Sequence, residues 1–258
     1  MNWEKYLNIE NEQPLDRFVE GISNTAIFRK IAFIGDSLSS GEFESCDENG
    51  KPGWHDYFEY SWGQYIARKN GLTAYNFSKG GMRADTYIKS FAEEKDFFNK
   101  DLACQAYVIA LGVNDILNAK QEIGSIADIK ESWKDYKETF AGYYAAIIQR
   151  YKEIQPQAKF FFVTMPNSGN ENRDALAKEH AKLLYDMADY FENSYVIDLN
   201  KNAPVYNEEF KRRYFLYGHM NASGYIFTAN MIDAYIDYII RHNPDDFRRV
   251  PFIGTGLK

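Results

Sequence analysis

Five short apolar runs alternate with helical patterns along this chain, and that alternation constrains the fold more than any other feature. The runs cover residues 30–35, 73–77, 106–111, 159–164 and 195–199, and Gly, Pro, Asn or charged residues bound them. Apolar runs of this length predict buried strands. Strands that alternate with helices predict a parallel sheet with helices on both faces. We therefore expect an α/β fold, one three-layer α/β/α domain over residues 1–258, with terminal arms at 1–25 and 249–258.

The helices are expected where apolar residues recur every three or four positions. The clearest pattern runs from Ile126 to Ile154 and predicts one long amphipathic helix that ends before Pro156. Other helices are expected over residues 176–190, over 225–239 after an Asn221 cap, near 61–69 and after residue 81. On the helix expected over residues 176–190, His180 falls on the apolar face and is expected to be a buried, hydrogen-bonded histidine.

Residues 41–60 are rich in Gly, acidic and aromatic residues and are expected to form one long loop. Long loops within a domain are often functional. The aromatic side chains between Trp54 and Trp62 would either line a substrate cleft or pack against the loop's own body. The sequence leaves both alternatives open.

Composition excludes several classes of function. The net charge is −7 and the basic residues are scattered, so we expect no nucleic-acid partner. No apolar run approaches the ~20 residues that span a bilayer, and the N-terminal residues lack the pattern of a signal peptide, which predicts a cytoplasmic protein. Cys46 and Cys104 lie far apart and predict neither a disulfide framework nor a metal site.

Polar blocks follow three of the predicted strands and precede the last helix. Ser37 follows the first strand, the segment 76–81 with its paired glycines follows the second, and Gly112-Val113-Asn114-Asp115 follows the third. His219 lies on the loop before the last helix. The carboxyl ends of parallel strands form the ligand-binding edge of such a sheet. A hydroxyl nucleophile, neutral hydrogen-bond donors and a histidine base are the groups needed for acyl transfer.

In order and spacing, these four blocks resemble those of the SGNH hydrolases, also called the GDSL family of esterases and lipases. The resemblance covers about residues 31–225 and implies a flavodoxin-like, five-stranded parallel sheet. It implies that Ser37 is the nucleophile and His219 the general base. It also implies an oxyanion hole made by the N–H groups of Ser37 and Gly81, with Gly80 as the alternative, and by Asn114 Nδ2.

One position departs from the family pattern. The family usually carries Asp three residues before the base, where this chain has Leu216. We expect a Ser37–His219 dyad in which the backbone carbonyl of Leu216 or Tyr217 orients the imidazole. The alternatives are a carboxylate from elsewhere, and the acids considered are Asp198, Glu208 and Glu209. The carboxylates of Asp36 and Asp115 are expected to tie turns together through local N–H groups.

The resemblance implies a serine esterase that hydrolyses small carboxylic esters through an acyl-enzyme, with acetylated carbohydrates as the first substrates to consider. No cofactor is expected, and no metal, because the sequence lacks metal-ligand spacing. The partner is then a small-molecule ester; the oligomeric state is left open. The alternatives are a non-catalytic module that binds a glycan or acyl group on the same fold, and a lysophospholipase or thioesterase.

Overall fold

The computed structural model describes residues 11–250 and contains a five-stranded parallel sheet with the order β4-β1-β5-β6-β7. The strands are β1 (Lys30–Gly35), β4 (Thr73–Ser78), β5 (Ala106–Ala110), β6 (Lys159–Val163) and β7 (Ser194–Ile197). Each lies within two residues of its predicted position. After β1 the chain forms β4 at the edge of the sheet, and it then returns to form β5 on the opposite side of β1. Ligands bind at such a switch point in open α/β sheets, so the end of β1 is the expected site.

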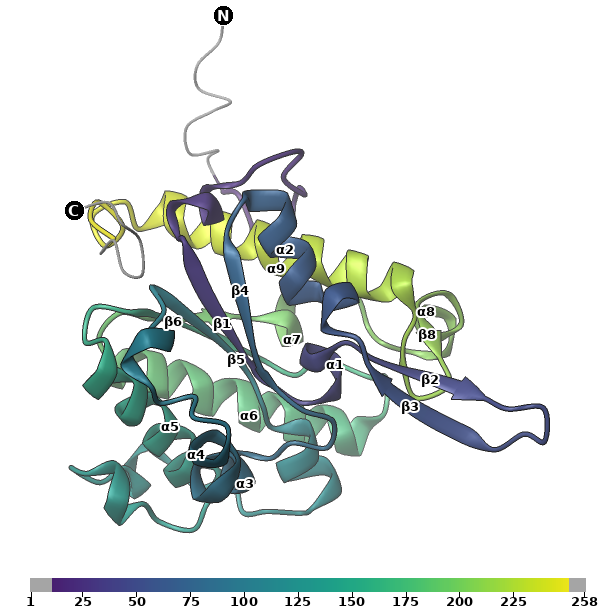
Figure 1. The fold of residues 1–258 in the computed structure, drawn as a ribbon, viewed down its shortest axis with the longest axis horizontal. Coiled ribbons are helices and arrows are strands. Elements are labelled where there is room, and N and C mark those ends of the chain that lie inside the picture. The colour runs from purple at the N-terminus through teal and green to yellow at the C-terminus, as the bar shows by residue number, and fades with distance from the viewer. Residues whose placement is uncertain (1–10, 251–258) are drawn as a thin grey trace, which may run out of the picture.

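Helices cover both faces of the sheet and confirm the predicted three-layer α/β/α architecture (Figure 1). Side chains alternate across β1: Ile31 and Phe33 pack toward the helices at 62–70 and 222–242, whereas Ala32 and Ile34 belong to the core beneath the helices at 140–154 and 171–190. The longer helices are α2 (Trp62–Asn70), α5 (Phe140–Ile154), α6 (Glu171–Tyr190), α8 (Glu208–Tyr214) and α9 (Ala222–His242). The shorter helical segments are η2 (Asn24–Ile27), α1 (Ser37–Ser40), η3 (Phe58–Tyr60), α3 (Ala84–Thr86), η4 (Tyr87–Phe91), α4 (Ala92–Glu94), η5 (Lys100–Leu102), η6 (Val113–Asn118) and α7 (Leu199–Asn202). No helix among residues 11–250 has the length and apolarity required to cross a membrane.

The predicted long helix from Ile126 is wrong in its first half. α5 begins only at Phe140, and the preceding residues form two short 3-10 turns, η7 (Ile126–Asp128) and η8 (Trp133–Asp135). Thr139 Oγ1 caps α5 by accepting from the Gly142 N–H at 3.2 Å, and it donates to Asp128 Oδ2 at 3.0 Å. Asp128 also closes its own turn by accepting from the Ser125 N–H. These local side-chain bonds make α5 begin at Phe140, although the apolar spacing extends further toward the N-terminus.

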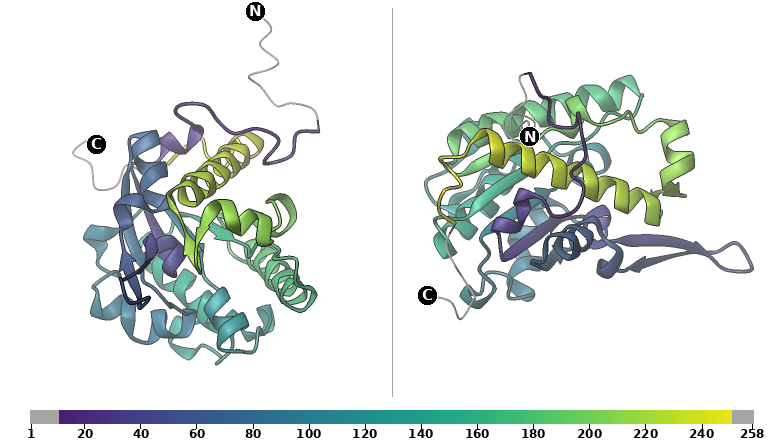
Figure 2. Two further views of the ribbon diagram at one scale, coloured as in Figure 1. Left: turned by 90° about the vertical axis from the view of Figure 1, so that its right-hand side faces the viewer. Right: turned by 90° about the horizontal axis from the view of Figure 1, so that it is seen from above.

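The expected loop at residues 41–60 is instead a β-hairpin that projects from the body (Figures 1 and 2). Its antiparallel strands are β2 (Glu42–Cys46) and β3 (Pro52–Asp56), in a register that pairs Glu42 with Asp56 and Glu44 with Trp54. Paired residues of neighbouring strands point to the same face. The hairpin therefore carries Glu42, Glu44, Trp54 and Asp56 on one face and Phe43 on the other. Phe43 packs against Tyr225 of α9.

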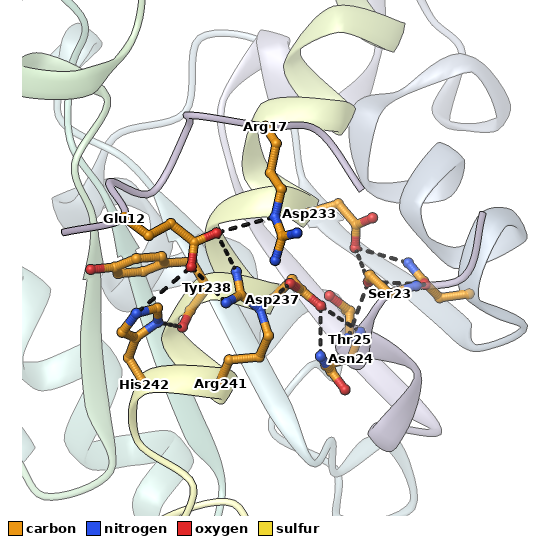
Figure 3. Close-up of polar contacts among 11 residues, drawn as sticks. Glu12, Arg17, Ser23, Asn24, Thr25, Asp233, Asp237, Tyr238, Arg241 and His242 are labelled. Carbon is orange, nitrogen blue, oxygen red and sulfur yellow. Dashed lines mark hydrogen bonds and ion pairs between the residues drawn. The ribbon is translucent and has the colours of Figure 1, made fainter. Parts of the chain in front are cut away.

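The N-terminal segment lies along α9 (Figure 3). Glu12 makes two hydrogen bonds with Arg241, at 2.7 and 3.0 Å, and Ser23 Oγ donates to Asp233 at 2.6 Å. The Asn24 N–H donates to Asp237 at 2.9 Å. Residues 1–10 and 251–258 of the predicted arms lie outside the described residues.

Candidate active site

Ser37 begins α1 directly after β1, at the carboxyl edge of the sheet. Asp36 caps this helix, because its Oδ1 accepts from the Leu38 N–H at 3.1 Å. A Cβ on Gly35 would lie 2.1 Å from Ser39 Oγ, so the turn needs glycine there. Within residues 11–250, the Ser37 N–H has no intramolecular acceptor, as is typical of the first residue of a helix. Asp36 thus has the predicted turn-forming role, and it presents Ser37 with a free N–H.

Asn114 lies between the nucleophile turn and the glycine block. Its Nδ2 donates to the Met82 carbonyl at 3.2 Å and lies 3.4 Å from Asp36 Oδ2. Its Oδ1 accepts from Asn118 Nδ2 at 2.8 Å, which fixes the direction of the amide. Gly81 immediately precedes Met82 and has a φ of +71°. The structure therefore brings the Asn114 amide, the Ser37 turn and the Gly81 backbone to one place.

Two buried groups hold the Asn114 loop. Asp115 Oδ1 accepts from the Ala84 N–H at 2.7 Å and has the turn-forming role predicted for it. Behind the loop, His180 Nε2 donates to the Leu111 carbonyl at 3.1 Å, and its Nδ1 accepts from the Met165 N–H at 3.4 Å. Burial lowers the pKa of His180 to about 4, which keeps the ring neutral for this pair of bonds. His180 is the buried, hydrogen-bonded histidine that the sequence predicted.

His219 lies on a second, short hairpin formed by β8 (Phe215–Leu216) and β9 (His219–Met220). Its Nδ1 contacts Glu44 Oε1, which also accepts from the Gly218 N–H at 3.1 Å. Its Nε2 lies 3.0 Å from Glu42 Oε1. The imidazole is thus held between two glutamates of β2, and Glu44 has the position of the orienting acid.

The prediction that a carbonyl of Leu216 or Tyr217 orients the base is therefore wrong. The three acids considered as alternatives lie in other contacts. Asp198 accepts from Thr164 Oγ1 and Tyr185 Oη, both at 3.0 Å, Glu208 pairs with Lys211 at 3.5 Å, and Glu209 pairs with Arg213 at 2.8 Å. The sequence does contain one signal for the missed acid, since Glu42 and Glu44 are two positions apart and share one face of a strand.

The site concentrates negative charge. Burial raises the pKa of Asp36 to about 6. The pKa of Glu42 is also raised, mainly by burial and further by the charges of Asp56 and Glu44. Such unbalanced clusters of carboxylates are typical of functional sites.

No hydrogen bond joins the side chains of Ser37 and His219 in the described chain. Ser37 Oγ makes no hydrogen bond within residues 11–250, and the Nε2 atom of His219 faces Glu42. The Glu42 carboxylate also fills the space beside Gly80, where an added Cβ would lie 2.1 Å from Oε2. Glu42 thus occupies the region between the base and the glycine block.

A cavity of about 720 Å³ adjoins these segments. Its walls include Asp36, Leu38 and Ser39 around Ser37, Leu111 and Val113 before Asn114, and Tyr217 and Gly218 before His219. Its inner wall is apolar, formed by Leu38, Trp62, Val163, Leu199, Met220 and Ile232. The cavity is therefore large enough for a small organic ester beside Ser37. No group of three or more His, Cys, Asp or Glu side chains in the described part of the chain could hold a metal.

Comparison with known proteins supports this assembly. The model of the GDSL-like lipase/acylhydrolase family matches residues 33–226, which include all four polar blocks. A search of curated proteins gave no match.

Three solved structures share the fold at low sequence identity. One is a carbohydrate esterase family 2 enzyme with a carbohydrate-binding domain from Corynascus thermopiles (Myceliophthora fergusii), at 13% identity and a TM-score of 0.58, covering 86% of this chain and 68% of that one. A second, an acetyl xylan esterase, has 20% identity and a TM-score of 0.51 over 79% of this chain and 97% of that one. A Lactobacillus plantarum protein has 16% identity and a TM-score of 0.58, over 82% and 97%. Because the family model spans most of the chain, this protein belongs to the GDSL-like lipase/acylhydrolase family and is a carboxylic ester hydrolase.

Proposed function

We propose that the protein hydrolyses small carboxylic esters through an acyl-enzyme on Ser37, with His219 as general base and Glu44 as its orienting acid. The observation that carries this proposal is the contact of His219 Nδ1 with Glu44, on a hairpin that adjoins the same cavity as the Ser37 turn. An acid at Nδ1 fixes the tautomer in which Nε2 can accept a proton, and it stabilises the imidazolium that forms.

In the first step, Ser37 Oγ bonds to the ester carbonyl carbon, its proton passes to His219 Nε2, and the carbonyl π electrons move onto oxygen. The oxyanion accepts hydrogen bonds from the N–H groups of Ser37 and Gly81 and from Asn114 Nδ2. Collapse breaks the bond to the alkoxy oxygen, and the alcohol leaves with the proton from His219. Water then repeats the sequence on the acyl-enzyme and releases the carboxylic acid.

Glu42 must leave Nε2 before this reaction can begin. Tyr225 Oη donates to the Glu42 carbonyl at 2.6 Å, so the backbone of Glu42 is held. Rotation of the Glu42 side chain alone would free the base. Catalytic hydrogen bonds are often incomplete without substrate, so a separated Ser37 and His219 are compatible with the mechanism.

The charge of the site favours neutral substrates. Glu42 and Glu44 contact His219, and the charges of Asp36 and Asp56 act on this cluster. Among the described residues, no Lys or Arg forms an ion pair with these four carboxylates. A phosphate-bearing ester, as in a lysophospholipid or a coenzyme thioester, would be repelled. The structural similarity to carbohydrate esterases supports acetylated sugars as substrates.

Ser37→Ala tests the proposal with p-nitrophenyl acetate. We expect kcat to fall by about 10⁴-fold or more with unchanged thermal unfolding, because only the nucleophile is removed. Ser45→Ala, on the exposed hairpin, is the matched control. A serine-reactive fluorophosphonate should add to the wild type at Ser37 and not to the variant, as measured by mass spectrometry. Turnover by Ser37→Ala within tenfold of wild type, or no turnover by either protein, would leave a binding module as the better description.

A further inference from the structure

Two exposed aromatic rings differ from all others in the described chain. Trp54 is 58% exposed and Tyr217 is 67% exposed, and neither contacts another ring nor makes a side-chain hydrogen bond. The other exposed aromatic residues among 11–250 all have such partners, namely Phe18, Tyr57, Tyr60, Tyr185 and Tyr190. Single exposed apolar residues are common, whereas exposed rings that gather around one site mark a binding surface.

Both rings flank the same glutamate. Trp54 pairs with Glu44 in the register of the hairpin, so its side chain lies on the face that carries Glu44 and Glu42. Tyr217 precedes Gly218, whose N–H donates to Glu44 Oε1. Trp54 and Tyr217 thus approach the Glu44–His219 contact from two different hairpins.

The backbone at Tyr217 adds a separate indication. Its φ is +58°, a left-handed conformation that is unfavourable for a bulky residue, and the glycine that would adopt it freely is the next residue. Strained residues of this kind gather at functional sites. Here the strained turn places a large ring at the wall of the cavity beside Ser37.

We propose that Trp54 and Tyr217 bind the alcohol part of the ester, and that this part is a neutral sugar. The apolar faces of a pyranose ring pack on aromatic rings, and its hydroxyl groups donate to carboxylates such as Glu42 and Asp56. The same carboxylates disfavour a uronic acid or a sugar phosphate. This inference rests on the proposed esterase function and names its substrate class.

The test compares kcat/KM for acetylated cellobiose with kcat/KM for ethyl acetate, which has no ring to stack. In Trp54→Ala and in Tyr217→Ala, the ratio of the two constants should fall about tenfold, chiefly through KM for the sugar ester, and Trp54→Phe should restore most of it. Tyr190→Ala is the matched control, since Tyr190 is an exposed ring on α6 far along the chain, and its ratio should equal that of the wild type. Wild-type enzyme should also prefer acetylated cellobiose to acetylated glucuronic acid.

Unchanged ratios in both alanine variants would overturn the inference. Hydrolysis of ethyl acetate but not of acetylated cellobiose by the wild type would overturn it while leaving the esterase function intact. If the wild type hydrolyses neither ester, the proposed function fails. Calorimetric titration with unmodified cellobiose then decides the inference alone, because binding that is lost in Trp54→Ala supports it and absent binding refutes it.

Discussion

Buried and partly buried carboxylates gather toward both ends of α9, and the two groups are built in opposite ways. Toward the C-terminal end, Glu12 and Asp237 share Arg241 (Figure 3). Asp233, one turn earlier, pairs with Lys69 at 2.8 Å. Before the N-terminal end, Asp36, Glu42 and Glu44 surround one histidine. The first group is neutralised by cations, whereas the second keeps an excess of negative charge.

The pKa shifts reflect this difference. Burial would raise the pKa of Glu12, but its hydrogen bonds and charge interactions with Arg241 lower it. Burial raises the pKa of Asp36 to about 6 and that of Asp115 to about 7. Glu12 therefore stabilises the fold above its unfolded pKa, and this contribution is lost as pH falls through its folded pKa. Asp36 and Asp115 instead make the fold less stable as pH rises from about 4 to about 6 or 7. The carboxylates toward the C-terminal end of α9 are thus balanced by cations and stabilise the fold. Those before its N-terminal end are unbalanced and belong to the candidate active site.

The largest expected effect is the loss of activity in Glu44→Gln. The amide keeps the shape of the side chain but no longer stabilises the imidazolium, so kcat/KM should fall by about a thousandfold, as for the orienting acid of other serine hydrolases. Thermal unfolding should change little. Glu48→Gln, in the turn of the same hairpin, is the control. If the activity of Glu44→Gln stays within tenfold of wild type, Glu44 is not the orienting acid and the site is a Ser37–His219 dyad.

The second-largest effect is a loss of stability when Arg241, toward the C-terminal end of α9, is replaced. Arg241→Met removes the cation that Glu12 and Asp237 share and leaves Glu12 with Arg17 at 3.1 Å, so the free energy of unfolding should drop by about 3 kcal/mol. Denaturant unfolding at pH 7 measures it, and kcat per folded molecule should stay within twofold. Arg213→Met removes an exposed pair and should cost less than about 0.5 kcal/mol. Equal costs for both variants would show that burial of the Arg241 pairs contributes nothing.

A smaller effect should appear in the pH dependence of stability. Asp115 is fully buried, and its Oδ2 has no hydrogen-bond partner in the described chain. Asp115→Asn removes a charge whose burial is unfavourable above pH 7. The free energy of unfolding of the variant minus that of the wild type should therefore be larger at pH 8 than at pH 4, by on the order of 2 kcal/mol. Unfolding curves at both pH values provide the measurement. Parallel pH profiles for variant and wild type would contradict the assignment of a raised pKa.

The smallest effect sharpens the contrast between the two glutamates on β2. Glu42 competes for Nε2, so Glu42→Ala should raise kcat/KM at pH 7 by a few-fold, roughly 1 kcal/mol or less, whereas Glu44→Gln lowers it. Initial rates on p-nitrophenyl acetate suffice, with Glu48→Ala as control. A large decrease in Glu42→Ala would instead make Glu42 part of the catalytic machinery.

Local pattern was enough to place most of the fold and the family blocks. β1 was predicted to the residue because Ile31, Phe33 and Ile34 are buried whatever packs on them, and the Asn221 cap fixed the start of α9. The long helix failed at Thr139, where a side-chain cap overrides apolar spacing. The hairpin at residues 41–60 was not predicted because β2 carries Glu42 and Glu44, and charged side chains are not typical of a strand.

The sequence by itself determined the parallel sheet, the family and the candidate reactive groups, since each depends on short-range spacing along the chain. Only the tertiary structure decided what surrounds His219. Glu44 lies 175 residues away in the chain, and its contact arises because β2 and β9 are brought together by packing of Phe43 on Tyr225. Spacing cannot encode a contact at that separation. The orienting acid, the competing Glu42 and the unpartnered rings of Trp54 and Tyr217 are consequences of how the chain packs.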